Sequence, residues 1–130
     1  MRSDDFPPDF ELSNEFKDAF DLMEGSGYNF FITGDAGTGK STLLKYFRKN
    51  TKKQTVVLAP TGVAAVNVSG QTIHSFFGFP LGLLTPDKIH RLKSKKVMRN
   101  MDTLIIDEVS MVRADIIDGI DYSLRLNRGI

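Results

Sequence analysis

Glycine and lysine residues stand at a spacing suited to binding a nucleotide's phosphates. The stretch "GDAGTGKS" fits the pattern G-x-x-x-x-G-K-[ST] at Gly34, Gly39, Lys40 and Ser41. Glycines, including Gly37 between them, allow a tight curl in which consecutive backbone N–H groups converge on one anion. A helix that begins near Lys40 would direct its positive dipole end at the same anion. The spacing predicts a phosphate-binding loop.

Three polar side chains at the end of this loop have separate expected roles. We expect Lys40 to reach the β- and γ-phosphates, the Ser41 hydroxyl to bind Mg²⁺, and Thr42 to donate to an outer phosphate. The predicted nucleotide-binding residues are Gly34, Asp35, Ala36, Gly37, Thr38, Gly39, Lys40, Ser41 and Thr42.

Two adjacent acids in "TLIIDEVSM" suggest the partner of this loop. Asp107 follows an apolar run and would stand at the carboxyl end of a strand, where parallel sheets bind ligands. There it would hold the Mg²⁺ shell together with Ser41. Glu108 is the candidate general base, because a carboxylate beside the metal can polarise an attacking water. We therefore expect Lys40 and Glu108 to be the catalytic residues.

The elements that position these residues alternate between strand and helix. Apolar runs at 29–33, 55–59 and 103–107 lack alternation, as is typical of strands buried on both faces of a parallel sheet. Helical spacing separates them and returns from Val112 to about Leu126. An earlier helix is expected to have Ser13 as N-cap and Gly25 as C-cap. The pattern predicts an α/β fold, with a flexible lead-in over 1–11 and one domain over 12–130.

Composition narrows the class of protein. The 130 residues carry a net charge of +1 and are 41% hydrophobic and 25% charged, as in ordinary globular domains. There is no cysteine, which excludes disulfides and thiolate metal sites. No apolar run approaches the roughly 20 residues that span a bilayer, and the acidic N-terminus lacks a signal-peptide core. We expect no membrane partner and a cytosolic location, or a nuclear or mitochondrial one in a eukaryote.

Three motifs in order resemble a known family. "FFITGDAGTGKST", "APTGVAAVNVSGQTIHSFFGFP" and "TLIIDEVSM" are together similar to the N-terminal part of superfamily 1B DNA helicases of the petite-integration-frequency (PIF) and RecD-like type, over about residues 12–128. The resemblance implies a P-loop NTPase with a RecA-like parallel sheet flanked by helices. It also implies ATP and Mg²⁺ as cofactors and ATP-driven 5′-to-3′ movement along DNA.

The middle motif implies contacts with single-stranded DNA. By resemblance, the DNA-binding residues are Thr61, Gly62, Thr72, His74 and Ser75. Hydroxyls and loop N–H groups can bind phosphate oxygens, and rings can stack on bases. An alternative is that His74 only packs its helix, and the phenylalanines at 76, 77 and 79 fit a core better than a base platform.

Two features fit the resemblance less directly. Relatives often carry a glutamine that reads the adenine edge where this chain has Phe16, so no residue here identifies the base. A basic run from Lys88 to Arg99, which includes Lys93, Lys95 and Lys96, could neutralise phosphates. Such a run, including His90, is more often a solvated helix face.

The resemblance also implies that this chain is only part of a motor. We expect the later strands of the domain, and a second RecA-like domain with an arginine for the γ-phosphate, to lie beyond Ile130. In RecA-like sheets the strand that follows the acidic-pair strand in sequence inserts between that strand and the P-loop strand. Without it, strand edges are unpaired, so self-association of this chain is expected. Two other classes remain open: another P-loop ATPase or small-molecule kinase, and a non-catalytic nucleotide- or DNA-binding remnant.

Overall fold

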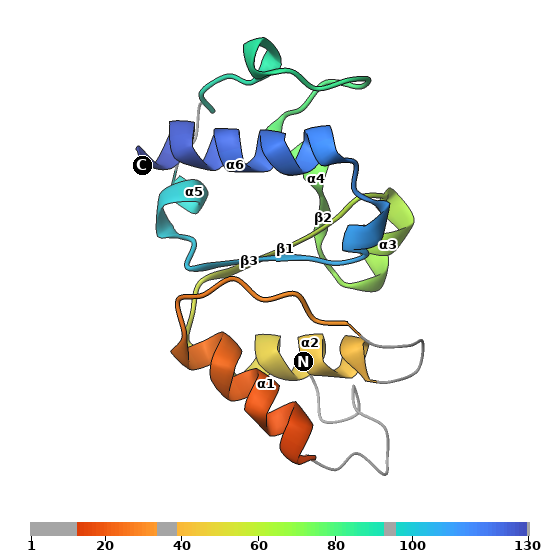
Figure 1. Cartoon of the computed structure of the whole chain (residues 1–130), viewed down its shortest axis with the longest axis vertical. Helices are drawn as coiled ribbons and strands as arrows, with labels where there is room; N and C mark the ends of the chain where they lie inside the picture. Colours follow the sequence, from red (N-terminus) through yellow and green to blue (C-terminus); the bar gives the residue numbers. More distant parts are fainter. Residues whose placement is uncertain (1–12, 34–38, 93–95, 130) are drawn as a thin grey trace. The chain divides into compact units, whose positions relative to one another are not determined.

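The computed structural model describes residues 13–33, 39–92 and 96–129 (Figure 1). The chain divides into two compact units, residues 1–53 and 54–130. Within the described residues, no helix is both long and apolar enough to cross a membrane.

The described part of the first unit contains two helices, α1 (Asn14–Gly25) and α2 (Lys40–Asn50). The Ser13 hydroxyl accepts the Phe16 N–H at 3.2 Å, so the predicted N-cap of α1 is confirmed. The helix continues through Gly25, and Ser26 is its C-cap. The predicted C-cap at Gly25 is therefore wrong by one residue.

Aromatic packing and polar contacts join α1 to α2. Phe20 lies edge-on to Tyr46 and Phe47, with ring centroids 5.2 and 5.9 Å apart. Near the other end of α1, Glu24 accepts hydrogen bonds from the Thr51 hydroxyl and, at 2.9 Å, from the Lys52 N–H. These contacts fix α1 against the helix that begins at Lys40.

Residues 29–33, predicted as the first strand, form no strand. Phe30, Phe31 and Ile32 are 44%, 73% and 42% exposed. A strand forms only where its N–H and C=O groups pair with a neighbouring strand, and no described residue pairs with this segment. Apolar composition without a partner does not hold an extended chain in a sheet.

The second unit is built on a three-stranded parallel sheet in the order β2-β1-β3. Strand β1 (Thr55–Ala59) has its predicted bounds, and β3 (Thr103–Ile106) ends one residue before the predicted limit. The short β2 (Gln71–Thr72) was not predicted. The remaining elements are α3 (Gly62–Asn67), α4 (Ile73–Phe77), η2 (Pro86–Lys88), α5 (Lys96–Asn100), η3 (Val109–Met111) and α6 (Ala114–Arg128). The predicted α/β class with helices flanking a parallel sheet is confirmed.

The core of this unit lies between the sheet and α6, which Figure 1 shows above β1 and β3. Ile116 and Ile120 of α6 belong to one buried cluster with Leu58 of β1. Phe77 and Phe79 are 3% and 7% exposed and lie in the same cluster, so their prediction as core residues is confirmed. β3 is only half-buried along its length because it is an edge strand of this sheet.

The basic run forms the expected exposed helix face only at its end, where Lys96 and Arg99 lie in α5. His90 is exposed and lies in no helix, so its prediction as a helix residue is wrong. The run instead turns inward at Ile89, which is 8% exposed, and at Met98, which is 1% exposed.

Candidate functional site

The three parallel strands end at one edge of the sheet, and each has a polar residue at or just after its end. The register pairs Leu58 of β1 with Ile106 of β3, and Ala59 with Thr72 of β2. Because these strands run in the same direction, the residues after them share the carboxyl edge of the sheet, where α/β proteins bind ligands. This edge, with Thr61, Thr72 and Asp107, is called the strand-tip edge below.

The acidic pair stands at the tip of β3. Asp107 is half-buried, and its main-chain N–H donates to the Leu58 carbonyl at 2.9 Å. Glu108 is exposed and has φ +54° and ψ +42°, a left-handed conformation that is uncommon for a residue other than glycine. Its carbonyl accepts the Met111 N–H at 3.0 Å, which closes the turn of η3. The backbone therefore turns sharply between a fixed Asp107 and an outward Glu108.

Thr61 is the N-cap of α3. Its hydroxyl oxygen accepts the Ala64 N–H at 3.2 Å. Accepting that bond leaves the hydroxyl hydrogen able to donate to another acceptor. Thr61 and Gly62 are both exposed. The arrangement suits a phosphate oxygen that approaches the strand-tip edge.

Thr72 repeats this arrangement on the next strand. Its hydroxyl oxygen accepts the Ser75 N–H at 3.2 Å and caps α4. Ser75 accepts in turn from the Gln71 side-chain amide at 2.9 Å, so Gln71 is a supporting residue that sequence reasoning missed. The His74 ring lies edge-on to Phe79, with centroids 6.3 Å apart, and is half-buried. His74 therefore packs on the core, whereas Ser75 is exposed.

The end of the predicted phosphate-binding loop lies in the first unit. Gly39 has φ +93°, a left-handed conformation open to glycine, and its carbonyl accepts the Leu43 N–H at 2.8 Å at the start of α2. The N-cap of α2 is Gly39, which has no side chain that could cap the first turn of the helix. Lys40 and Ser41 are exposed and Thr42 is half-buried. The predicted residues Gly34, Asp35, Ala36, Gly37 and Thr38 lie outside the described residues.

The structure thus assembles part of the predicted site. It brings Asp107, Glu108, Thr61 and Thr72 to one edge of one sheet. Lys40, Ser41 and Thr42 belong to the other compact unit. Phe16 packs its ring edge-on against Tyr46, with centroids 5.2 Å apart, so its position in α1 has a packing explanation.

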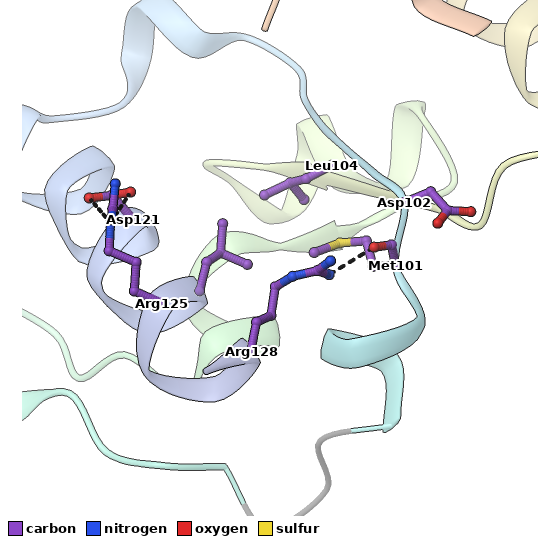
Figure 2. A pocket seen from close by; sticks show the side chains of 7 residues that line it. Met101, Asp102, Leu104, Asp121, Arg125 and Arg128 are labelled. Carbon is purple, nitrogen blue, oxygen red and sulfur yellow. Dashed lines mark hydrogen bonds and ion pairs between the residues drawn. The ribbon is translucent and has the colours of Figure 1, made fainter. Parts of the chain in front are cut away.

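Two cavities of the second unit lie away from the strand-tip edge. One of about 270 Å³ lies between the amino end of β3 and α6, lined by Met101, Leu104 and Arg128 among others (Figure 2). Another of about 320 Å³ lies between the segment around Leu84 and α6. At its rim, the Arg113 guanidinium and the Leu84 N–H hold the pKa of Asp115 below its ordinary value. Neither cavity is lined by a predicted site residue.

A parallel sheet with an acidic pair at the tip of β3, in a chain with a Gly-Lys-Ser-Thr helix start, defines the α/β P-loop class. The chain belongs to the PIF1-like helicase family, whose family model matches residues 11–128.

Relatives in sequence and structure agree with this assignment. The chain is 41% identical over 124 residues to the ATP-dependent DNA helicase PIF1 of Saccharomyces cerevisiae, which covers 88% of this chain and 14% of that protein. It is 43% identical over 114 residues to the ATP-dependent DNA helicase Pif1 of Bdellovibrio bacteriovorus, covering 80% of this chain and 25% of that protein. The chain therefore spans a quarter or less of these two relatives.

Solved structures match at a similar level. A Bacteroides Pif1 helicase in complex with ADP-AlF3 and single-stranded DNA is 43% identical, with a TM-score of 0.82 over 92% of this chain and 29% of that chain. The Pif1 helicase of Candida albicans is 37% identical, with a TM-score of 0.78 over 92% of this chain and 29% of that chain.

Proposed function

We propose that this chain is the ATP-binding part of an ATP-dependent 5′-to-3′ DNA helicase. The observation that carries the proposal is the strand-tip edge, where the acidic pair and two threonine-capped helix starts follow neighbouring parallel strands. Relatives named as ATP-dependent DNA helicases support the activity, and the Bacteroides complex with a nucleotide analogue and single-stranded DNA supports both ligands.

The nucleotide is proposed to bind at the start of α2. The N–H groups at the start of α2 and the Lys40 ammonium group are suited to the phosphates, as are the N–H groups of Gly34 to Thr38. Thr42 would donate to an outer phosphate. ATP is proposed from the family, because Phe16 has no polar group that could read the base. Comparing hydrolysis of ATP and GTP tests this choice.

The donor set fits magnesium. Mg²⁺ prefers oxygen ligands, and the Asp107 carboxylate and the Ser41 hydroxyl are oxygen donors placed at a strand tip and a helix start. When bound, the ion would neutralise charge on the phosphates. Glu108 is proposed to accept a hydrogen bond from the attacking water and to take its proton.

Single-stranded DNA is proposed to contact the same edge of the second unit. The hydroxyl hydrogens of Thr61 and Thr72 and the exposed backbone at Gly62 are suited to successive phosphates. Ser75 has a hydroxyl hydrogen available in the same way, since it accepts from Gln71. His74 is proposed to contact the single strand while its ring stays packed against Phe79.

The test is DNA-stimulated ATP hydrolysis by the whole protein. We expect single-stranded DNA to stimulate hydrolysis, Lys40→Ala to abolish nucleotide binding, and Glu108→Gln to lower the rate on the order of 10²- to 10⁴-fold. Lys45→Ala, an exposed lysine of the same helix, is the matched control. Hydrolysis without any response to DNA would favour another P-loop enzyme, and an unchanged rate in Glu108→Gln would favour a remnant without chemistry.

The cell location of the protein is proposed to be cytosolic, nuclear or mitochondrial.

The 130-residue chain on its own is proposed to self-associate. Exposed Phe30, Phe31 and Ile32 support self-association, because unpaired apolar segments are association hazards. Sedimentation of the chain should show species larger than a monomer, and a stable compact monomer would contradict the proposal.

A further inference from the structure

We propose that cations beside the C-terminal end of α6 form a second nucleic-acid surface, which binds the phosphate backbone of duplex DNA. The surface comprises the exposed side chains of Arg91, Lys96 and Arg99. The inference rests on the proposed DNA-dependent function, but it adds a different ligand at a different place.

A buried amide fixes the first part of this surface. Asn127 of α6 is 2% exposed, and its side-chain oxygen accepts the Leu92 N–H at 2.9 Å. Its side-chain nitrogen donates to the Ser123 carbonyl at 2.9 Å. Because both ends of the amide are bonded, the backbone beside Arg91 is held against the last turns of α6.

A second set of bonds fixes α5 at the same place. Arg128 donates to the carbonyls of Met98 and, at 2.8 Å, Met101. Figure 1 shows α5 beside the end of α6 that leads to the C-terminus. Lys96 and Arg99 are therefore carried by a backbone that is already ordered, so binding would require little further ordering.

No ion pair among the described residues joins an acid to Arg91, Lys96 or Arg99. No aspartate or glutamate occurs from 88 to 101. Of the acids that follow, Asp121 pairs with Arg125, and Asp102 accepts the Gln54 N–H at 2.9 Å. The two ion pairs among the described residues use Arg113 and Arg125 and leave this surface positive.

The surface lies at the opposite end of the sheet from the strand-tip edge. α5 precedes β3, whereas Asp107 follows it. Four strand residues at about 3.3 Å each place the two ends of β3 about 13 Å apart. One ligand group cannot occupy both places, so these cations are not part of the proposed nucleotide and single-strand site.

The chemistry of the surface fits a duplex better than a single strand. Proteins that bind single strands usually stack bases on aromatic rings, and no Phe, Tyr or Trp occurs from 88 to 101. Guanidinium and ammonium groups alone bind phosphates without reading sequence. A duplex next to the single strand offers such phosphates at high density.

The test compares two DNAs that share one single-stranded segment, one of which continues into a duplex. Affinity of the whole protein is measured from low to high salt for the wild type and for Arg91→Gln/Lys96→Gln/Arg99→Gln. The control, Lys17→Gln/Lys45→Gln/Lys52→Gln, removes the same charge from exposed lysines of the first unit.

We expect the first variant to bind the duplex-containing DNA at least about tenfold more weakly, with its salt slope smaller by about 0.9 for each phosphate that is no longer neutralised. Binding to the single strand should be unchanged in this variant, and the control should bind both DNAs as the wild type does. Equal weakening for both DNAs, or no weakening for either, overturns the proposal. No weakening would instead favour an acidic protein as the partner that binds this surface. Failure of the wild type to bind the single strand would instead count against the proposed function.

Discussion

The main-chain N–H of Asp107 donates to the carbonyl of Leu58 at 2.9 Å, one residue beyond the end of β3. This bond extends the ladder between β1 and β3, so the position of Asp107 is set by the central strand of the sheet. The next residue, Glu108, leaves the ladder in a left-handed conformation. The two acids therefore have different freedom: Asp107 is held, and Glu108 is turned outward.

The conformation of Glu108 predicts opposite effects on stability and chemistry. A residue with a Cβ is strained at positive φ by about 1–2 kcal/mol, and glycine is not. We expect Glu108→Gly to keep or slightly raise the free energy of unfolding measured in urea, while DNA-stimulated hydrolysis is lost. Glu108→Gln is the matched variant, because it keeps the strain and removes only the carboxylate. A loss of more than about 1 kcal/mol in Glu108→Gly would contradict the strain.

The two roles of Thr61 can be separated by substitution. Thr61→Ala should lower the free energy of unfolding by about 1 kcal/mol, because the Ala64 N–H loses its cap. Thr61→Asp should keep that cap but weaken single-strand binding, since a carboxylate lacks the hydroxyl hydrogen and repels phosphate. Thr61→Ser should retain both properties. Strong DNA binding by Thr61→Asp would show that the hydroxyl only caps α3.

Gly70 predicts a severe steric effect. A Cβ added there would lie 2.5 Å from the Val57 carbonyl oxygen of β1, a backbone atom that cannot rotate away. We expect Gly70→Ala to lower the free energy of unfolding by about 2–4 kcal/mol. Gly62→Ala is the control for stability, because no atom lies within 4 Å of its added Cβ. Equal denaturation midpoints for the two variants would contradict the close approach.

Glu24 predicts a pH-dependent contribution to stability. The Thr51 hydroxyl and then the Lys52 N–H lower the pKa of this carboxylate from its ordinary value of 4.5. A lowered pKa in the folded state means that the contribution is present above the unfolded pKa and is lost as pH falls through the folded pKa. Thermal melts from pH 7 to pH 3 should show a smaller acid-induced loss in Glu24→Gln than in the wild type. Parallel curves would contradict the assignment.

The sequence predicted those elements whose own residues show a recognisable pattern, such as an apolar run or a capping residue. The bounds of β1 follow from a short apolar run, and the cap of α1 follows from Ser13. The strand prediction for residues 29–33 failed because an apolar run predicts burial but not the neighbouring strand that must pair with it. β2 was missed because two residues are too short for periodicity, although Ser69 and Gly70 before it are a turn signal.

The site was predictable in its residue types but not in its supporting contacts. The acidic pair was assigned to a strand tip, and the structure places Asp107 there. The hydrogen bond from Gln71 to Ser75 depends on a turn geometry that spacing does not encode. The roles of the phosphate-binding residues and of the DNA-contacting residues stay predictions.

The amide of Asn127 has a consequence for how the second unit opens. Leu92 lies in no helix or strand, yet its N–H is bonded to a buried side chain. In a hydrogen–deuterium exchange measurement, this amide should be as slow as those of β1, because deuterium can reach it only when the end of α6 unwinds. Fast exchange at Leu92 would mean that the loop detaches alone. Slow exchange would make the loop and the helix end a single cooperative unit.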